Sequence, residues 1–158
     1  MRRVAALSLC LLLSLPVLVL SGCEGCQNLL YRSAIQKALH EDSLTGKDAT
    51  DDHVAAMRKV DLSGCPPDFN VAYAKYIEAW EFSAKVQTAK AKLDNESDAA
   101  AAAGLLATLF GSDETPWSDH LAAEARLAQM NVDAANQIQS SWNAITEVSA
   151  KYGVQFSQ

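Results

Sequence analysis

The sequence predicts an all-α protein, a small helical bundle built on a long antiparallel helix pair with shorter helices packed on it. Apolar residues recur at steps of three and four over several stretches, which is the period of an amphipathic helix. Residues that start or stop helices separate these stretches, and no segment has the alternating pattern of a strand. The 158 residues are enough for one such domain.

Two shorter helices are expected in the first half of the chain. The first covers residues 28–41 and is followed by a polar loop. The second begins after Thr50, because Asp51 and Asp52 follow in the first turn, where negative charge suits the helix dipole, and it ends near Val60. The apolar stripe expected to be buried on the first helix contains Leu30, Tyr31, Ala34, Ile35, Ala38 and Leu39.

Two longer helices are expected to form the antiparallel pair. One covers residues 67–93 and begins at Pro67, a residue suited to the first helical position. The other has Thr115 as its N-cap and continues to about Tyr152, with Gly153 as its stop. The expected core of the first is Phe69, Tyr73, Tyr76, Ile77, Trp80 and Ala84, whose aromatic members would alternatively line a ligand groove. The expected core of the second is Trp117, Leu121, Ala128, Val132, Ala135, Ile138, Trp142, Ile145 and Tyr152.

Between these two helices, residues 99–110 contain no charged side chain. A helix that is apolar all round must be buried in protein, in a partner or in lipid. Twelve helical residues cover only about 18 Å, too short for a bilayer core of about 30 Å. We hypothesise that this segment is a mobile flap, with polar linkers on both sides, which offers four side chains to a protein partner or to lipid: Leu105, Leu106, Leu109 and Phe110. In the preceding linker, Asp94, Glu96 and Asp98 alternate as in a calcium loop, but Ala99 and Leu105 replace its required glycine and glutamate.

The N-terminus has the features of a secretory signal. Arg2 and Arg3 precede an apolar run over residues 4–20, which is too short and too poorly flanked for a stable membrane span. The run ends in Leu20, Ser21, Gly22 and Cys23, which resembles the lipobox of bacterial lipoproteins. This resemblance implies cleavage before Cys23 and acyl chains on its sulfur and its new amino group. The alternative, a retained anchor helix, is less favoured because small residues lie where a signal peptidase cuts.

The resemblance also implies a location and a division of the chain. Glu24 follows the cysteine in place of the aspartate that marks retention in the inner membrane, so we expect the periplasmic face of the outer membrane. The expected segments are a signal peptide (1–22), a lipid-anchored N-terminus (23–27), one helical domain (28–153) and a tail (154–158). Residues 61–81 resemble a segment of small uncharacterised bacterial envelope proteins, a likeness that implies no activity.

The charge balance makes nucleic acid an unlikely partner class. Without residues 1–22 the chain has 11 Lys and Arg against 19 Asp and Glu, a net charge of −8, and phosphate contacts need clustered basic residues. Residues 94–158 hold 9 of these acidic residues and only 2 basic ones. Because this half repels anionic headgroups, we expect any membrane-facing surface in the N-terminal half.

The cysteines predict one disulfide. Cys10 leaves with the signal and Cys23 is acylated, so Cys26 and Cys65 remain as a pair in an oxidising compartment. A haem attachment would need a histidine where Gln27 stands, and a zinc site built on Cys23, Cys26 and Cys65 would lack a fourth ligand. We therefore predict a bond between Cys26 and Cys65.

No catalytic or cofactor motif is present, and we predict neither a metal site nor an enzyme. His40, His53 and His120 each adjoin acidic residues and form no pair at helical ligand spacing, so we expect them on solvated faces. The expected function is a non-catalytic lipoprotein module that binds or scaffolds another envelope protein. The alternative is a membrane-active or apolar-ligand-binding domain that uses residues 99–110, and an enzyme with a site assembled from scattered residues is the third hypothesis.

Overall fold

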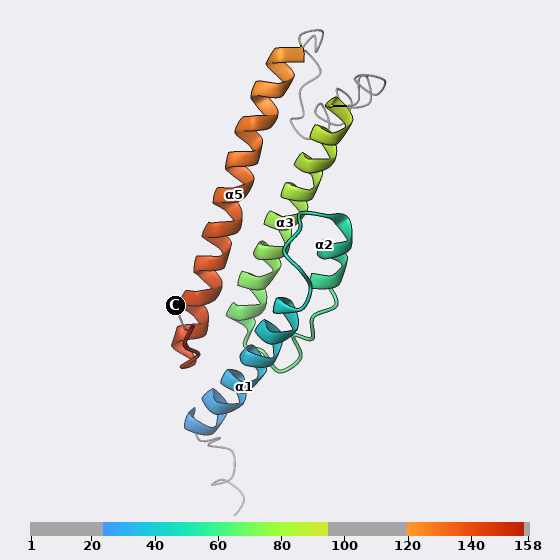
Figure 1. Ribbon diagram of the computed structural model, residues 1–158. Helices are drawn as coiled ribbons and strands as arrows, with labels where there is room; N and C mark the ends of the chain where they lie inside the picture. The colour runs from blue at the N-terminus through green and yellow to red at the C-terminus, as the bar shows by residue number, and fades with distance from the viewer. Residues whose placement is uncertain (1–23, 95–119, 157–158) are drawn as a thin grey trace, which may run out of the picture.

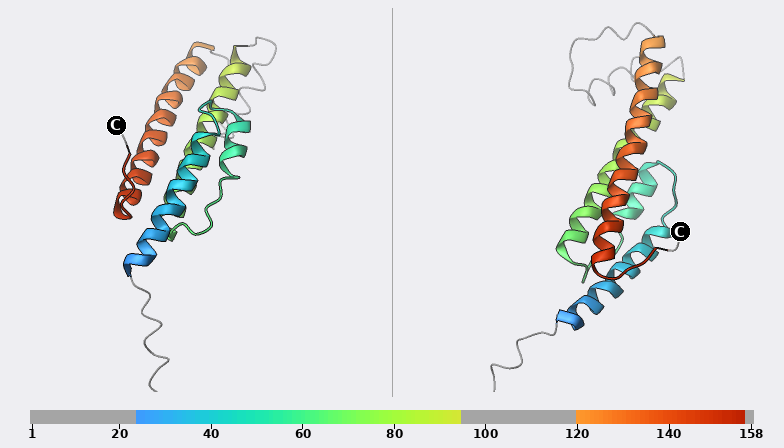
Figure 2. Two further views of the ribbon diagram at one scale, coloured as in Figure 1. Left: turned by 60° about the horizontal axis from the view of Figure 1, so that its bottom comes forward. Right: turned by 90° about the vertical axis from the view of Figure 1, so that its left-hand side faces the viewer.

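The computed structural model describes residues 24–94 and 120–156. It contains the helices α1 (Glu24–Ser43), α2 (Asp51–Met57), α3 (Pro67–Leu93) and α5 (His120–Lys151), and no strand within the described residues. The helices α3 and α5 lie side by side and antiparallel, α2 packs beside α3, and α1 crosses the half of the pair where α3 begins (Figure 1 and Figure 2). The predicted all-α bundle on a long helix pair is confirmed.

The start of α3 follows from the residues before it. Gly64 has a φ of +83°, a left-handed conformation that glycine adopts without strain, and this turn leads into the buried residues Cys65 and Pro66. Pro67 then occupies the first turn of α3, where no intrahelical N–H is needed. The helix runs to Leu93, so both of its predicted bounds are confirmed.

The short helix α2 depends on its cap. The Thr50 side chain accepts a hydrogen bond from the His53 backbone N–H at 3.2 Å, which confirms the predicted N-cap. The helix ends at Met57, three residues before the predicted end, and Val60 is half-buried. Val54 and Met57 are buried as expected.

The end of α5 is a glycine stop. Gly153 has a φ of +76°, its N–H donates to the Ala150 carbonyl, and the Val154 N–H donates to the Ser149 carbonyl, which together form a Schellman motif. Val154 is 5% exposed, and the Phe156 ring packs edge-on against Trp142 at 5.6 Å. The predicted stop at Gly153 is confirmed, and the described residues after it, as far as Phe156, pack on the bundle.

The helix α1 is longer than expected and buries less of its first turns. It begins at Glu24, four residues before the predicted start. Ile35 and Ala38 are fully buried as predicted, but Leu30 is 72% exposed. The reason is that the first turns of α1 project beyond the ends of α3 and α5, where no other described helix lies beside them (Figure 1 and Figure 2).

The core consists of two clusters along the α3–α5 pair. One lies where α1 crosses the pair and contains Ile35, Ala38, Cys65, Phe69, Ala72, Tyr73, Ile145 and Val154. The other lies between α3 and α5 alone and contains Val86, Ala89, Leu93, Leu127 and Met130.

The buried face of α5 differs from the prediction in the first half of the helix. Leu127, Met130 and Ala134 are buried, whereas the predicted Ala128, Val132 and Ala135 are exposed. A shift of one residue turns a helical face by about 100°. In the second half the prediction holds for Ile145, which is fully buried, while Ile138, Trp142 and Tyr152 are half-buried.

The predicted disulfide is absent, since Cys26 and Cys65 are both free thiols. A Cβ placed on Gly64, the neighbour of Cys65, would lie 3.7 Å from the Ala34 Cβ. Ala34 follows Cys26 by eight residues, which is about 12 Å along a helix, whereas a disulfide requires Cα atoms within about 7 Å. The continuous helix α1 therefore holds the exposed Cys26 away from the buried Cys65.

Among the described helices, none is long and apolar enough to cross a membrane.

Candidate functional site

All four described helices contribute to a hollow of about 470 Å³, which we call the aromatic cleft. Its apolar lining comes from α1, α3 and α5, and polar side chains come from the end of α1, the following loop and α2. The residues that define it are Leu39, Asp42, Lys47, His53, Tyr76, Trp80, Ile138, Gln139 and Trp142. A volume of this size, with apolar walls and a few polar groups, is typical of ligand sites.

The rings of the aromatic cleft pack against one another at steep angles. Tyr76 lies edge-on to Trp80, with ring centroids 6.2 Å apart, and is tilted by 45° against Trp142 at 5.5 Å. His53 lies edge-on to Trp80 at 4.7 Å. These contacts fix the rings in place, so the cleft is preformed and needs little ordering to bind an occupant.

Two polar atoms of this cluster have no hydrogen-bond partner among the described residues: His53 Nε2 and Trp80 Nε1. His53 is 6% exposed, and its Nδ1 lies 3.1 Å from the Thr45 carbonyl, which only accepts hydrogen bonds. Nδ1 is therefore the donor, and in neutral His53 the atom Nε2 is an acceptor. The indole N–H of Trp80 is a donor. Both atoms are themselves buried, so an occupant of the cleft does not reach them while the rings stay in place.

A carboxylate lies at the edge of the cleft on the last turn of α1. Asp42 Oδ1 accepts a hydrogen bond from the buried Tyr73 hydroxyl at 2.7 Å. Burial raises the pKa of Asp42, against the opposing effects of the Tyr73 hydroxyl and of His53. Burial and the Asp42 carboxylate also raise the pKa of Tyr73 strongly, so this phenol stays protonated and acts as a donor.

A second hollow adjoins the aromatic cleft. It measures about 550 Å³ and shares the residues Leu39 and Trp142 with the cleft. The chain after α5 forms its other wall through Val154, Gln155 and Phe156. Residues 154–156 thus extend the lined surface from α5 towards α1.

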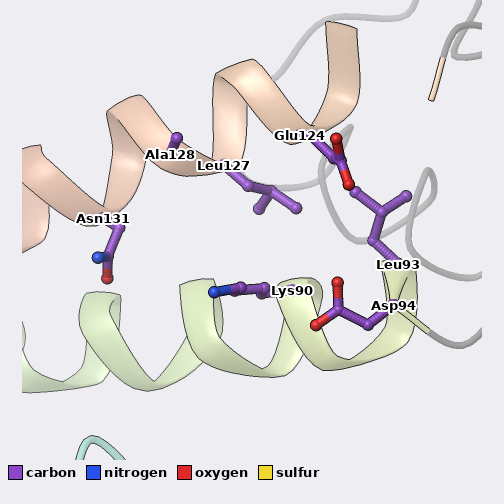
Figure 3. A pocket seen from close by; sticks show the side chains of 7 residues that line it. All are labelled: Lys90, Leu93, Asp94, Glu124, Leu127, Ala128 and Asn131. Atoms are coloured by element: carbon purple, nitrogen blue, oxygen red, sulfur yellow. The ribbon is translucent and has the colours of Figure 1, made fainter. Parts of the chain in front are cut away.

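A third hollow, of about 280 Å³, lies between the end of α3 and the first half of α5 (Figure 3). Leu127 points from α5 towards α3, whereas Lys90 and Asp94 lie along the α3 side of the hollow (Figure 3). Leu93 and Leu127 are nearly fully buried. The charged side chains around them have both signs, so the hollow has no single-sign field to attract a charged ligand.

The predicted site residues divide into two groups. Cys23 and the segment 99–110, with Leu105, Leu106, Leu109 and Phe110, lie outside the described residues. The aromatic residues of α3 lie within the described part of the chain. Some of them form core and others line the cleft, the two roles that the sequence predicted. Phe69 and Tyr73 are core with no exposed surface, whereas Tyr76 and Trp80 line the cleft.

The histidine prediction was wrong in one place. His40 is exposed as expected, but His53 is buried against Trp80 and is not on a solvated face. Sequence reasoning also missed Asp42 and Lys47, which it assigned to an ordinary polar loop. No local signal marks them, because they meet the rings of α3 and α5 only through the tertiary fold.

Within the part of the chain that the structure describes, no group of three or more His, Cys, Asp and Glu side chains is placed to hold a metal ion. Comparison with known proteins identifies no relative: no family model, no curated protein and no solved structure matches this chain.

Proposed function

We propose that this protein is a lipid-anchored lipoprotein of the bacterial envelope whose helical domain binds another envelope protein and has no catalytic role. The observation that carries the binding proposal is the aromatic cleft, a preformed hollow whose rings are fixed by mutual packing. The anchor proposal is supported by the sequence from Leu20 to Cys23, which resembles a lipobox, and Glu24 favours the outer membrane.

The cleft has the chemistry of a protein-recognition surface. Buried aromatic side chains contribute most of the binding free energy in many protein interfaces, and Trp80, Tyr76 and Trp142 are fixed by mutual packing. A peptide segment supplies both carbonyl oxygens and N–H groups. Its carbonyl groups would accept from Lys47 and its N–H groups would donate to Asp42, both at the polar edge of the cleft. The adjoining hollow lengthens the surface enough for several residues of a partner.

The binding proposal is tested with two matched substitutions on α5. Gln139 and Gln137 are both exposed, but only Gln139 lines the cleft. Gln139→Trp should fill the cleft, whereas Gln137→Trp adds the same side chain on another face of the helix. In cross-linking and pull-down from intact envelopes, we expect a specific protein with the wild type and with Gln137→Trp, and a loss of it with Gln139→Trp. Equal recovery with all three would contradict the assignment of the cleft.

The anchor proposal is tested at Cys23. Changing Cys23→Ser removes the sulfur that the proposed lipidation needs, so we expect an unprocessed precursor or a protein released from the membrane fraction. Several acyl chains, each contributing about 0.8 kcal/mol per buried methylene, would otherwise hold the protein almost permanently. A Cys23→Ser protein that is processed normally and stays membrane-bound would refute lipidation.

The alternative function is the binding of an apolar ligand or of lipid by residues 99–110. The described feature that favours it is the hollow between the end of α3 and the first half of α5, the two helices that precede and follow this segment in the sequence. Solvent extraction of purified protein followed by mass spectrometry tests this alternative. A stoichiometric apolar molecule in the extract would favour it over protein binding.

A further inference from the structure

Large apolar side chains are exposed at the end of the molecule where α1 begins. Leu29 is 66% exposed and Leu30 is 72% exposed, and both lie in the first two turns of α1. This end also contains the start of α3 and the end of α5. The Tyr31 ring packs edge-on against Tyr152 at 5.4 Å, and the Tyr152 hydroxyl donates to Asp68 Oδ1 at 3.0 Å. We call it the anchor end.

No flexible linker separates Cys23, the proposed anchor, from the helix that carries this surface. The helix α1 begins at Glu24, the residue directly after Cys23. Leu29 and Leu30 follow Cys23 by six and seven residues, which is about 10 Å along a helix. The polar interface on each side of a bilayer core is about 5–8 Å thick. Acyl chains on Cys23 would therefore hold both leucines at or next to the lipid interface.

The charges at the anchor end do not oppose this docking. Arg32 and Lys151 are exposed there, and Glu24 and the half-buried Asp68 offset them. The anchor end is therefore close to neutral, and an anionic lipid surface does not repel it. The docking is carried by the two exposed leucines and by their short distance from Cys23.

We propose that the anchor end is a membrane-docking surface, with Leu29 and Leu30 inserted at the lipid interface and Arg32 among the headgroups. The docking rests on the proposed lipidation of Cys23. It makes the bundle stand on the membrane in a fixed direction, with the end of α3 and the start of α5 away from lipid. Leu39 and Asp42 then lie about 25–30 Å along α1 from Cys23, so the aromatic cleft is clear of the bilayer and open to a partner.

The test uses the full lipoprotein in vesicles of phosphatidylethanolamine and phosphatidylglycerol. In a Cys26→Ser background, a fluorophore is attached to Leu30→Cys, to Leu44→Cys at the other end of α1, or to Val132→Cys on α5. All three native side chains are more than half exposed, so these sites tolerate a label. We expect a lipid-bound quencher to reduce the emission at position 30 several-fold more than at positions 44 and 132.

A second measurement separates docking from simple proximity to the anchor. A label at the exposed Ser33→Cys is read with and without the pair Leu29→Ser and Leu30→Ser, which should not affect the fold. We expect the pair to reduce quenching at position 33 to the level seen at position 132. Unchanged quenching at position 33 would overturn the role of the two leucines.

Mass spectrometry of the N-terminal peptide from the same preparation distinguishes the two proposals. Acylated Cys23 with strong quenching at position 30 supports both. Acylated Cys23 with equal quenching at positions 30 and 132 overturns the docking and leaves the lipid anchor standing. An unmodified Cys23 overturns the anchor, and the docking that rests on it falls too.

Discussion

Folding shifts the pKa values of two aspartates, Asp42 and Asp61, in opposite directions. Burial raises the pKa of Asp42, whereas the ammonium of Lys37, with Nζ 2.6 Å from Asp61 Oδ2, and the hydrogen bonds from Ser63 lower the pKa of Asp61. The ionised form of Asp42 is therefore disfavoured in the folded state, so its contribution to stability falls as pH rises above 3.8. Asp61 contributes stability above pH 3.8, and this contribution is lost as pH falls further.

We predict opposite pH dependences for two isosteric substitutions. Asp42→Asn keeps an acceptor for the Tyr73 hydroxyl but cannot ionise, so it should gain stability relative to wild type between pH 4 and pH 7. Asp61→Asn should lose stability at pH 7, and this loss should disappear in strong acid. Denaturant titrations across this pH range measure both differences. Parallel curves for the two variants would contradict the assigned pKa directions.

At the level of elements, α2 is the helix most dependent on a single residue. It has only 7 residues, well below the roughly 12 that an isolated helix needs. The Thr50 side chain accepts a hydrogen bond from the His53 N–H, one of the first-turn N–H groups without a partner inside the helix. We predict that Thr50→Ala destabilises the protein by about 1 kcal/mol. Thr88→Ala, at an exposed position inside α3, is the control and should have no such cost. A smaller loss for Thr50→Ala than for Thr88→Ala in denaturant titration would argue against the cap.

The buried face of α5 gives a second prediction at this scale. Leu127 is 3% exposed in the cluster with Val86 and Leu93, whereas Val132 is 52% exposed. Leu127→Ala should cost about 2–4 kcal/mol, because it removes buried methyl groups and leaves a cavity. Val132→Ala should change stability by less than about 0.5 kcal/mol. A larger stability loss for Val132→Ala than for Leu127→Ala, in thermal or denaturant unfolding, would show that the buried face is the one predicted from the sequence.

In the whole molecule, α1 is the least firmly attached of the long helices. The backbones of α3 and α5 lie close together along much of the pair. The backbone of α1 comes close to the other helices at few positions. It is held by the fully buried Ile35 and Ala38 and by side-chain contacts from Tyr31, Lys37 and Asp42. Because Leu39 lines both the aromatic cleft and the adjoining hollow, release of α1 would open the two together.

We therefore predict that hydrogen exchange is faster in α1 than in the middle of α3 and α5. The exchange of α1 amides should reflect local opening, and the amides around Tyr73 and Ile145 should approach the protection set by global unfolding. Exchange followed by mass spectrometry on the intact protein measures both regions. Equal protection in α1 and α3 would show that α1 opens only with the whole domain.

The sequence by itself determined the elements of this protein and several of their ends. Thr50, Pro67 and Gly153 set helix bounds through hydrogen bonds and backbone conformations that involve only near neighbours in the chain. Helical period and cap chemistry are local properties, so a single sequence contains them. The all-α fold and the bounds of α3 followed directly.

The tertiary structure decided which faces meet. In α5 the frequent alanines make neighbouring stripes similarly apolar, and only the side chains that α3 presents select Leu127 over Ala128. The exposure of Leu30, the burial of His53 and the separation of Cys26 from Cys65 likewise depend on where one helix ends relative to another. The aromatic cleft needs four helices from distant parts of the chain. Its residues carry no local signature because a cleft is a property of packing, which the periodicity of any one helix does not contain.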